Sequence, residues 1–324
     1  MKICVYGAGA IGGYLAVELA LSGHDVCVVA RGAHLEAIRQ HGLRLHVQGR
    51  EKVAKVLADS DPRALGPQDM VICALKAHQA FDVAESFAPL LKSDTPVVTA
   101  MNGIPWWYFY KTGGPFDGRY LQTVDPGGRQ WMSIGPQRAI GCVVEPACEV
   151  IAPGVIAHHQ FNRFIIGEPD GSRSHRVQQL NEVLTAAGFD APIRDNIRWN
   201  IWLKLWGNVC FNPIAALTGA TLGRMIGNPD LRALCKTMML ETQSVNEALG
   251  VHIPTEMMDR RLEAAATATD HKMSMLQDLE RGRSLEIDAL VGAVQELGRL
   301  TSVKTPMVDA LLALIRERAA GLTG

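Results

Sequence analysis

The chain has 324 residues, a formal net charge of −1 and seven cysteines. This length predicts two domains, and the balanced charge argues against nucleic acid or an anionic membrane as a partner. An apolar run of roughly 18 residues, which a membrane span needs, does not occur. Cysteines without a CxxC pair are typical of reduced thiols in a cytoplasmic protein, and the early first strand leaves no room for a signal peptide.

The N-terminal segment carries the most specific motif. An apolar strand at residues 3–6 leads into Gly7, Gly9 and Gly12, and a helix and a second strand at 26–30 follow. Glycines at this GxGxxG spacing inside a strand–helix–strand unit indicate a dinucleotide-binding loop. They allow a tight turn, the approach of a pyrophosphate and close helix–strand packing, respectively. The alternative is a glycine-rich turn without a ligand. The predicted cofactor loop comprises Gly7, Ala8, Gly9, Ala10, Ile11 and Gly12.

The end of the second strand indicates which dinucleotide binds. NAD sites usually place Asp or Glu about 20 residues beyond the glycines, where it binds the ribose 2′-hydroxyl. This chain has Arg31 there and no carboxylate. Because a guanidinium can pair with a 2′-phosphate through two parallel hydrogen bonds, we predict NADP(H) rather than NAD(H). The alternative is a solvated arginine at the end of a strand.

The rest of the first half alternates short apolar runs with helical patterns. Residues 43–58 predict a hairpin with its turn at 48–50, and the apolar runs at 70–75 and 95–100 predict buried parallel strands. A crossover helix is expected at 80–91. Further strands are expected at 139–144, 154–159 and 163–168, and a further helix at 174–188.

The second half contains helical patterns only. Strands followed by a run of helices indicate an α/β domain joined to an all-α domain. We therefore predict an N-terminal Rossmann domain at 1–194 and a helical substrate and dimerisation domain at 195–324. The helices are expected at roughly 196–217, 229–249, 255–280, 284–300 and 305–319.

The segment 104–138 interrupts the first domain. It combines the aromatic run Trp106, Trp107, Tyr108, Phe109 and Tyr110 with many turn-forming residues. A long loop in a compact domain is usually functional or disordered, and the aromatic residues argue against disorder. Two interpretations remain open: a surface excursion that packs on its own aromatics, or a lid or dimer contact.

The first predicted helix of the second half contains a polar stripe. Lys204, Asn208 and Asn212 are spaced at four-residue intervals and share one helix face. Their neighbours are mostly apolar, so these groups need polar partners. A cleft beside a cofactor would provide them, and so would a structural hydrogen-bond network. A second set, Ser274, Asp278 and Glu286, follows later in the chain and is by itself typical of an ordinary helix.

Two further candidates follow predicted strands of the first domain. Lys76 comes directly after the run at 70–75, and Asn102 comes shortly after the run at 95–100. Ligands of open α/β sheets bind at the carboxyl ends of strands, so both residues are candidates for cofactor or substrate contacts. The alternative is an ordinary polar residue at a strand end. The histidines show no metal-ligand spacing, and we predict no metal.

Together these motifs resemble the ketopantoate reductase (2-dehydropantoate 2-reductase) family along nearly the whole chain. The most specific parts are KLWGNVCFNP, which ends at Pro213, and SMLQD at 274–278 followed by EID at 286–288. The resemblance implies a Rossmann domain followed by a helical domain of the 6-phosphogluconate dehydrogenase C-terminal type. It also implies NADPH-dependent reduction of ketopantoate to pantoate. Two departures are the extra segment 104–138 and Lys272-Met273, where small hydroxyl residues are common.

The resemblance assigns a role to each candidate. Lys204 would donate the proton to the ketone, and Glu286 would position Lys204 and contact the cofactor ribose or the substrate hydroxyl. Substrate would be bound by Asn102, Asn208, Asn212 and Ser274, with support from Asp278. The cofactor would be bound by the glycine loop, Arg31, Lys76, Asn102 and Glu286.

Other assignments remain open. A paralogue acting on another branched 2-oxo acid, another two-domain dehydrogenase, and a non-catalytic NADP(H)-sensing protein are the alternatives. The only other partner expected is a second copy of the chain, because small cytosolic enzymes commonly form homodimers.

Overall fold

The computed structural model describes residues 1–321. By their internal contacts the residues divide into two units, Met1–Tyr120 with Asp125–Ile197, and Leu121–Val124 with Arg198 onward. The functional boundary that we expect between residues 194 and 195 stays a prediction. Within the described residues, each helix is too short or too polar to cross a membrane.

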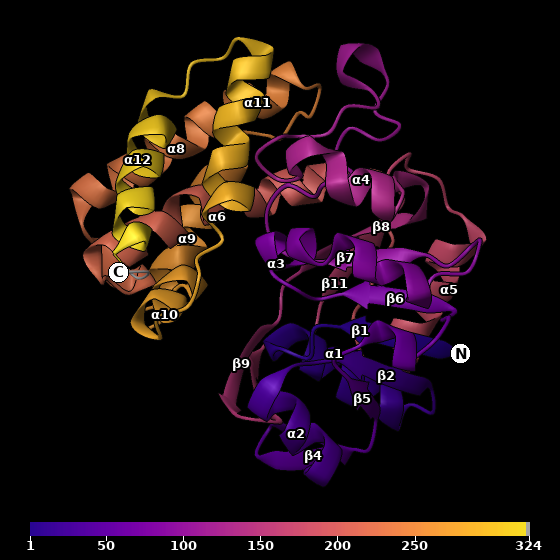
Figure 1. Ribbon diagram of the computed structural model, residues 1–324. Coiled ribbons are helices and arrows are strands. Elements are labelled where there is room, and N and C mark those ends of the chain that lie inside the picture. The colour runs from indigo at the N-terminus through magenta and orange to yellow at the C-terminus, as the bar shows by residue number, and fades with distance from the viewer. Residues whose placement is uncertain (322–324) are drawn as a thin grey trace. The chain divides into compact units, whose positions relative to one another are not determined.

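The first unit is built on a seven-stranded sheet with the order β11-β8-β7-β6-β1-β2-β5 (Figure 1). All neighbours pair in parallel except β11, which pairs antiparallel with β8 at one edge. The six parallel strands have the Rossmann order, so the predicted fold class is confirmed. The strands are β1 (Lys2–Tyr6), β2 (Asp25–Val29), β5 (Leu57–Asp59), β6 (Met70–Cys73), β7 (Val97–Ala100), β8 (Ala139–Val144) and β11 (Phe164–Gly167).

A smaller sheet packs against the first helix. Its order is β4-β3-β10-β9, and α1 (Ala10–Leu21) contacts all four strands as well as β1 and β2. The predicted hairpin is present but shorter than expected, because β3 and β4 pair antiparallel whereas residues 57–59 form β5 of the main sheet. Positive φ angles at Gln48 and Gly49 match the primed turn that suits a strand twist. The strands are β3 (Leu43–Val47), β4 (Arg50–Ala54), β9 (Ala147–Ala152) and β10 (Val155–Gln160).

The crossover between β6 and β7 differs from the expected helix at 80–91. It forms a short α-helix, α3 (Ala77–Asp82), followed by a 3₁₀ segment, η2 (Ala84–Leu90). Pro89 lies inside η2 and cannot donate a backbone hydrogen bond, which disfavours a continuous α-helix. The other helices of this unit are α2 (Gly32–His41) and α5 (His175–Ala186), the latter capped by the Ser174 side chain, which accepts from Val177 N.

Most of the segment 104–138 packs into the first unit. Trp106, Trp107, Tyr108 and Phe109 are all at most 3% exposed, and the Trp107 indole donates to Thr99 Oγ1 on β7 at 2.9 Å. These aromatic residues therefore extend the core of the first unit instead of packing only on one another as a surface excursion, and a role of the segment as a lid or dimer contact stays a prediction. Its regular elements are η3 (Gly114–Phe116), η4 (Pro126–Gly128), α4 (Arg129–Ser133) and η5 (Pro136–Arg138).

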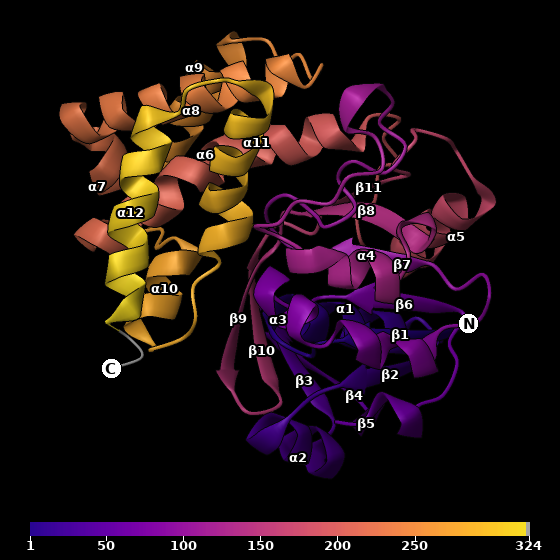
Figure 2. The same ribbon diagram turned by 45° about the horizontal axis from the view of Figure 1, so that its top comes forward.

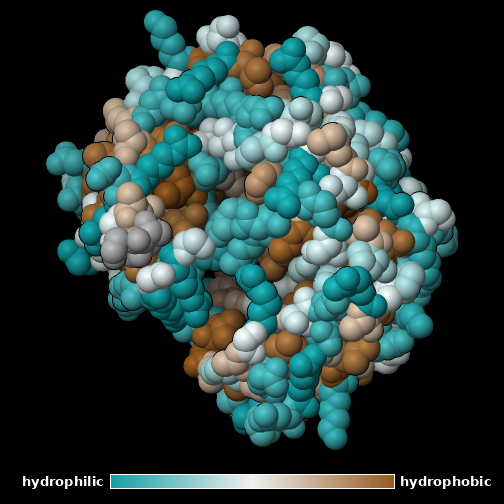
Figure 3. All heavy atoms as spheres, viewed as in Figure 1, coloured by the Kyte–Doolittle hydropathy of each residue, from teal (hydrophilic) through white to brown (hydrophobic). Residues whose placement is uncertain are grey.

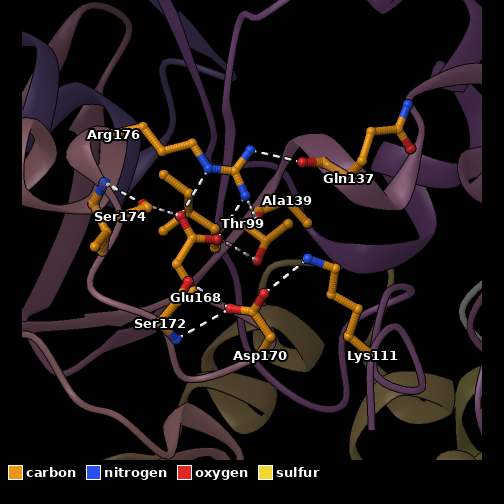
Figure 4. Close-up of polar contacts among 11 residues, drawn as sticks. Thr99, Lys111, Gln137, Ala139, Glu168, Asp170, Ser172, Ser174 and Arg176 are labelled. Carbon is orange, nitrogen blue, oxygen red and sulfur yellow. Dashed lines mark hydrogen bonds and ion pairs between the residues drawn. The ribbon is translucent and has the colours of Figure 1, made fainter. Parts of the chain in front are cut away.

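A buried carboxylate, Glu168, ties the end of β11 to the region before β8 (Figure 4). Its oxygens accept from Arg176 Nε at 2.7 Å and Nη2 at 2.6 Å, and Ser174 Oγ also donates to it. Arg176 donates further to the carbonyls of Gln137 and Ala139. Glu168 is only 3% exposed. It needs these hydrogen bonds because a buried carboxylate without partners lowers the stability of the fold.

The second unit consists of helices that surround α8 (Figure 2). Helix α8 packs against α7, α9, α11 and α12. It also holds α6, because Trp206 Nε1 donates to Asn246 Oδ1 at 3.0 Å. The elements are α6 (Ile197–Thr218), α7 (Leu222–Gly227), α8 (Pro229–Ala248), α9 (Glu256–Thr267), α10 (Ser274–Glu280), the π-helical turn η6 (Asp288–Gly292), α11 (Ala293–Thr301) and α12 (Pro306–Ala320).

The helix expected at 255–280 is wrong, because the chain breaks into α9 and α10. The connecting residues instead bind the start of α7. The carbonyl of Thr269 accepts from Thr221 Oγ1, and the carbonyl of His271 accepts from Leu222 N. The helix expected at 284–300 begins later than predicted, at η6. The residues just before the expected start form a turn in which Asp278 O accepts from Arg281 N and Arg283 N.

Four residues of the inserted segment, 121–124, belong to the second unit. Glu296 on α11 accepts from Gln122 N at 2.8 Å and from Thr123 N at 2.7 Å. One turn earlier, a Cβ on Gly292 would lie 2.8 Å from Thr123 Cγ2, so the glycine allows this close approach. Both ends of the short segment are buried. The insertion is thus anchored in both units of the chain.

The surface in Figure 3 is largely hydrophilic, with small separate groups of hydrophobic residues. The large hydrophobic side chains that are exposed come from many different elements, and single exposed side chains of this kind are normal on a protein surface. They are Leu21, Val53, Leu57, Tyr120, Met132, Ile151, Phe161, Leu240 and Leu314.

Candidate functional site

Four of the predicted cofactor groups lie at one edge of the main sheet. The strands β7, β6, β1 and β2 are consecutive neighbours and all parallel. Their carboxyl ends therefore meet at the same edge, where ligands of doubly wound sheets bind. Asn102 follows β7, Lys76 follows β6, the glycine loop follows β1, and Arg31 follows β2.

Two glycines of the loop are required by sterics. Gly7 has a φ of +97°, and a Cβ there would lie 2.7 Å from Leu75 Cδ2. A Cβ on Gly12 would lie 1.9 Å from the Gly7 carbonyl oxygen and 3.0 Å from Ala74 Cβ. Any side chain at either position would therefore displace the backbone of the loop from β6 or from the start of α1.

The second glycine of the motif is different. Gly9 has a φ of −67°, which any residue can adopt, and apart from its two neighbours in the chain none of the described residues places an atom within 4 Å of its Cβ position. The fold alone does not require a glycine here, and the open space is what an approaching pyrophosphate needs. Residue 9 is also the N-cap of α1, and no described side chain caps the helix. The N–H groups of its first turn thus suit an anion.

Arg31 is the N-cap residue of α2 and is exposed. It therefore lies beyond the carboxyl end of β2, the strand beside β1, where a residue that binds a 2′-phosphate would lie. Lys76, the N-cap residue of α3, and Asn102 are both half-buried and border the same edge from the other side. These residues fit a dinucleotide laid across the carboxyl ends of the central strands.

Sequence reasoning missed His34, which contacts the loop directly. Its Nε2 lies 2.6 Å from the Ala8 carbonyl oxygen, and its Nδ1 accepts from Gly154 N at 2.9 Å. A histidine soon after the second strand gives a weak signal by itself. Gly154, whose N–H group fixes the orientation of the ring, lies 120 residues further along the chain.

The polar stripe of the second unit lies on α6, as predicted. Lys204 and Asn208 are half-buried, and Asn212 is 2% exposed. The intervening residues on the helix, such as Leu205 and Val209, are buried. The carbonyl of Lys204 accepts from Arg261 Nη2 at 3.2 Å, which fixes the backbone of the stripe.

Two of the predicted substrate residues are brought together by the fold. The amide oxygen of Asn212 accepts from Ser274 Oγ and from Met275 N, both at 3.2 Å. This links α6 to the first turn of α10 and satisfies a free N–H of that helix. Asp278 lies one turn further along α10, and Glu286 lies just before η6; both are half-buried. Single π-helical turns often occur near functional sites.

Among the described residues, His, Cys, Asp and Glu side chains do not come together in any group of three or more that could hold a metal ion. The described cysteines are all free thiols. Burial raises the pKa of the Cys73 thiol to about 12, so this group behaves as a neutral core side chain.

Comparison with known proteins matches both units to one family. The family model described as ketopantoate reductase PanE/ApbA matches residues 3–171, and the model of its C-terminal part matches residues 196–319. A 2-dehydropantoate 2-reductase from Mesorhizobium japonicum is 56% identical over 320 residues, which cover 98% of each chain.

Two solved structures share the architecture of both units. One, from Ralstonia solanacearum MolK2 and provisionally assigned as a ketopantoate reductase, is 42% identical with a TM-score of 0.94, and the match covers 99% of this chain and 98% of that chain. The other, a PanE/ApbA family ketopantoate reductase from Ralstonia eutropha JMP134, is 29% identical with a TM-score of 0.85 and full coverage of both chains.

Proposed function

The chain belongs to the ketopantoate reductase family of NADP(H)-dependent oxidoreductases, and we propose that it reduces 2-dehydropantoate (ketopantoate) to pantoate. The observation that carries this proposal is the relative from Mesorhizobium japonicum, which is 56% identical over the whole length and is named for this reaction. The candidate residues on both units supply groups of the right chemistry for a dinucleotide and a 2-oxo acid.

The cofactor half of the proposal rests on the sheet edge. The loop from Gly7 to Gly12 would hold the pyrophosphate beside the first turn of α1, and Arg31 would pair with the 2′-phosphate. The open space at Gly9 supports this arrangement, because a side chain there would fill it. Lys76, Asn102 and Glu286 would contact other parts of the dinucleotide. When bound, NADPH supplies the hydride that reduces the ketone carbon.

The substrate half rests on the polar stripe of α6. The ammonium of Lys204 would donate a hydrogen bond to the ketone oxygen, stabilise the negative charge that develops there and then transfer a proton to it. Asn208, Asn212 and Ser274 would bind the 2-oxo acid, Asp278 would support them, and Asn102 would contact the substrate as well as the cofactor. Glu286 would position Lys204.

The test is NADPH oxidation, followed by absorbance, with a panel of 2-oxo acids. We expect ketopantoate to give the largest kcat/KM, and NADPH to be preferred over NADH. A larger kcat/KM with another branched 2-oxo acid would move the substrate assignment to that compound. Absence of NADPH oxidation with every 2-oxo acid, by protein that binds NADPH, would overturn the proposal.

Two further parts of the proposal concern the state of the protein in the cell. We infer a homodimer, which light scattering combined with size-exclusion chromatography tests by the molar mass in solution. We also infer a cytoplasmic location, in keeping with the free cysteines among the described residues. Fractionation of cells that express the full chain tests this location.

A further inference from the structure

We propose that His34 is a positioning residue that sets the affinity and selectivity for NADPH by tying the glycine loop to the start of α2. The inference rests on the proposed use of NADPH, with Arg31 on the 2′-phosphate. In the structure the imidazole lies between two backbone groups that are far apart in the sequence.

The hydrogen bonds define the state of the ring. Gly154 N carries a hydrogen and donates it, so Nδ1 of His34 is the acceptor and bears no proton. The proton of a neutral imidazole is then on Nε2, which donates to the Ala8 carbonyl oxygen at 2.6 Å. Both ring nitrogens are thereby engaged by the backbone. The side chain acts through the position of the loop.

One side of this bridge is a fixed point of the fold. Gly154 lies in the turn between β9 and β10 with a φ of +73°, and its carbonyl accepts from Arg44 N at 2.9 Å. A Cβ on Gly154 would lie 3.1 Å from Ala37 Cβ, so the turn packs closely on α2. The imidazole is therefore held by its own helix and by the smaller sheet.

The other side of the bridge is the part of the loop that approaches the cofactor. Ala8 lies between the two loop glycines Gly7 and Gly9, and its carbonyl receives the Nε2 hydrogen bond. His34 is three residues beyond Arg31, in the first turn of α2, where Leu35 N also donates to Arg31 O. One hydrogen bond thus fixes the loop for the pyrophosphate relative to the residue for the 2′-phosphate.

This arrangement predicts a selective effect on binding. A ligand that contacts two sites at once gains affinity when the sites are held at the correct separation before it binds. Loss of the bridge should weaken NADPH, which uses both the loop and Arg31, more than NADH, which lacks the 2′-phosphate. Glutamine can replace the bridge, because its amide has both a donor nitrogen and an acceptor oxygen, whereas the alanine side chain has neither.

The experiment uses the full chain and measures Kd for NADPH and for NADH by nucleotide fluorescence, without a 2-oxo acid. We expect His34→Ala to raise the Kd for NADPH about five- to tenfold and the Kd for NADH less. His34→Gln should recover most of the NADPH affinity. The matched control is His41→Ala, since His41 is the exposed last residue of the same helix, and it should leave both constants unchanged.

A double substitution separates positioning from a general loss of structure. Arg31→Ala should lower the ratio of the NADH to the NADPH constant, and adding His34→Ala to Arg31→Ala should not lower this ratio further. Unchanged NADPH affinity in His34→Ala would overturn the inference, and so would equal weakening of NADPH and NADH. Because no ketone is present, a negative result here leaves the proposed reduction of ketopantoate open to its own test.

Discussion

The glycine loop of the first unit and helix α6 of the second unit contribute to the proposed function in different ways. In the loop the important features are backbone features: open space at Gly9, free N–H groups, and close approach at Gly12. On α6 the helix is an ordinary support, and the proposed function assigns the chemistry to the side chains of Lys204, Asn208 and Asn212. Substitutions in the loop are therefore expected to change the space for a ligand or the stability of the fold. Each substitution on α6 is expected to remove one proton transfer or one set of hydrogen bonds and to leave the helix in place.

The largest effect is expected for Lys204→Ala. Without the proton donor, turnover should fall by a factor of about 10² to 10⁴, while NADPH still binds because the loop is unchanged. Steady-state kinetics and a fluorescence titration of NADPH measure the two quantities separately. Lys236→Ala is the control, because this exposed lysine pairs with Asp259 on the surface of the second unit. Turnover within threefold of the wild type in Lys204→Ala would refute the role of the lysine.

The next effect contrasts two glycines of the loop. Gly12→Ala forces a Cβ against the Gly7 carbonyl, so it should lower the free energy of unfolding by about 3 kcal/mol or more. Gly9→Ala should leave the free energy of unfolding within about 0.5 kcal/mol of the wild type and still weaken NADPH binding, because the new methyl group occupies open space beside α1. Urea denaturation and NADPH titration test the pair. Equal stability of the two variants would contradict the steric argument.

A smaller effect separates two amides of the α6 stripe. Asn212→Ala leaves Ser274 Oγ and the buried Met275 N without their acceptor, so it should cost about 1 to 3 kcal/mol of stability. Asn208→Ala should change stability by less than about 0.5 kcal/mol and raise the KM for the 2-oxo acid. Chemical denaturation and kinetics on both variants test this contrast. If Asn208→Ala were the less stable of the two, Asn212 would not hold α6 to α10.

The smallest effect is expected from a surface pair in the first unit. Asp170 accepts from Lys111 Nζ at 2.8 Å and from Ser172 (Figure 4), and these hydrogen bonds hold the pKa of its carboxyl well below the usual range. The stabilisation is present above the ordinary carboxyl pKa of about 4 and is lost as the pH falls. Asp170→Asn should therefore cost less than about 1 kcal/mol at neutral pH, and the difference from the wild type should shrink in acid.

Urea denaturation of the wild type and Asp170→Asn at neutral and acidic pH measures this difference. A gap that widens as the pH falls would reverse the sign and contradict the assignment. The two side chains of the pair are partly exposed, so solvent screens their attraction. We therefore expect this surface pair to contribute less to the free energy of unfolding than the close backbone approach at Gly12.

Several features of the fold and site could be read from local patterns. The apolar runs and the glycine spacing of the first unit predict its first strand, loop and helix. The four-residue spacing of Lys204, Asn208 and Asn212 likewise predicts that they share one face of α6. The prediction of one helix over 255–280 is wrong because the break in this helix depends on hydrogen bonds to residues far away in the sequence. The carbonyls of Thr269 and His271 accept hydrogen bonds from residues 221 and 222. Local periodicity carries no information about such a partner.

Sequence patterns are sufficient to predict the fold class, the placement of the glycine loop and the helix face shared by Lys204, Asn208 and Asn212. These depend on steric and hydrophobic effects that act within a few residues. Three contacts are visible only in the folded chain. His34 joins Ala8 to Gly154, Asn212 accepts a hydrogen bond from Ser274, and Glu296 holds residues 121–124 in the second unit. Each of these contacts joins residues separated by long stretches of chain, and chain folding alone brings them within hydrogen-bonding distance.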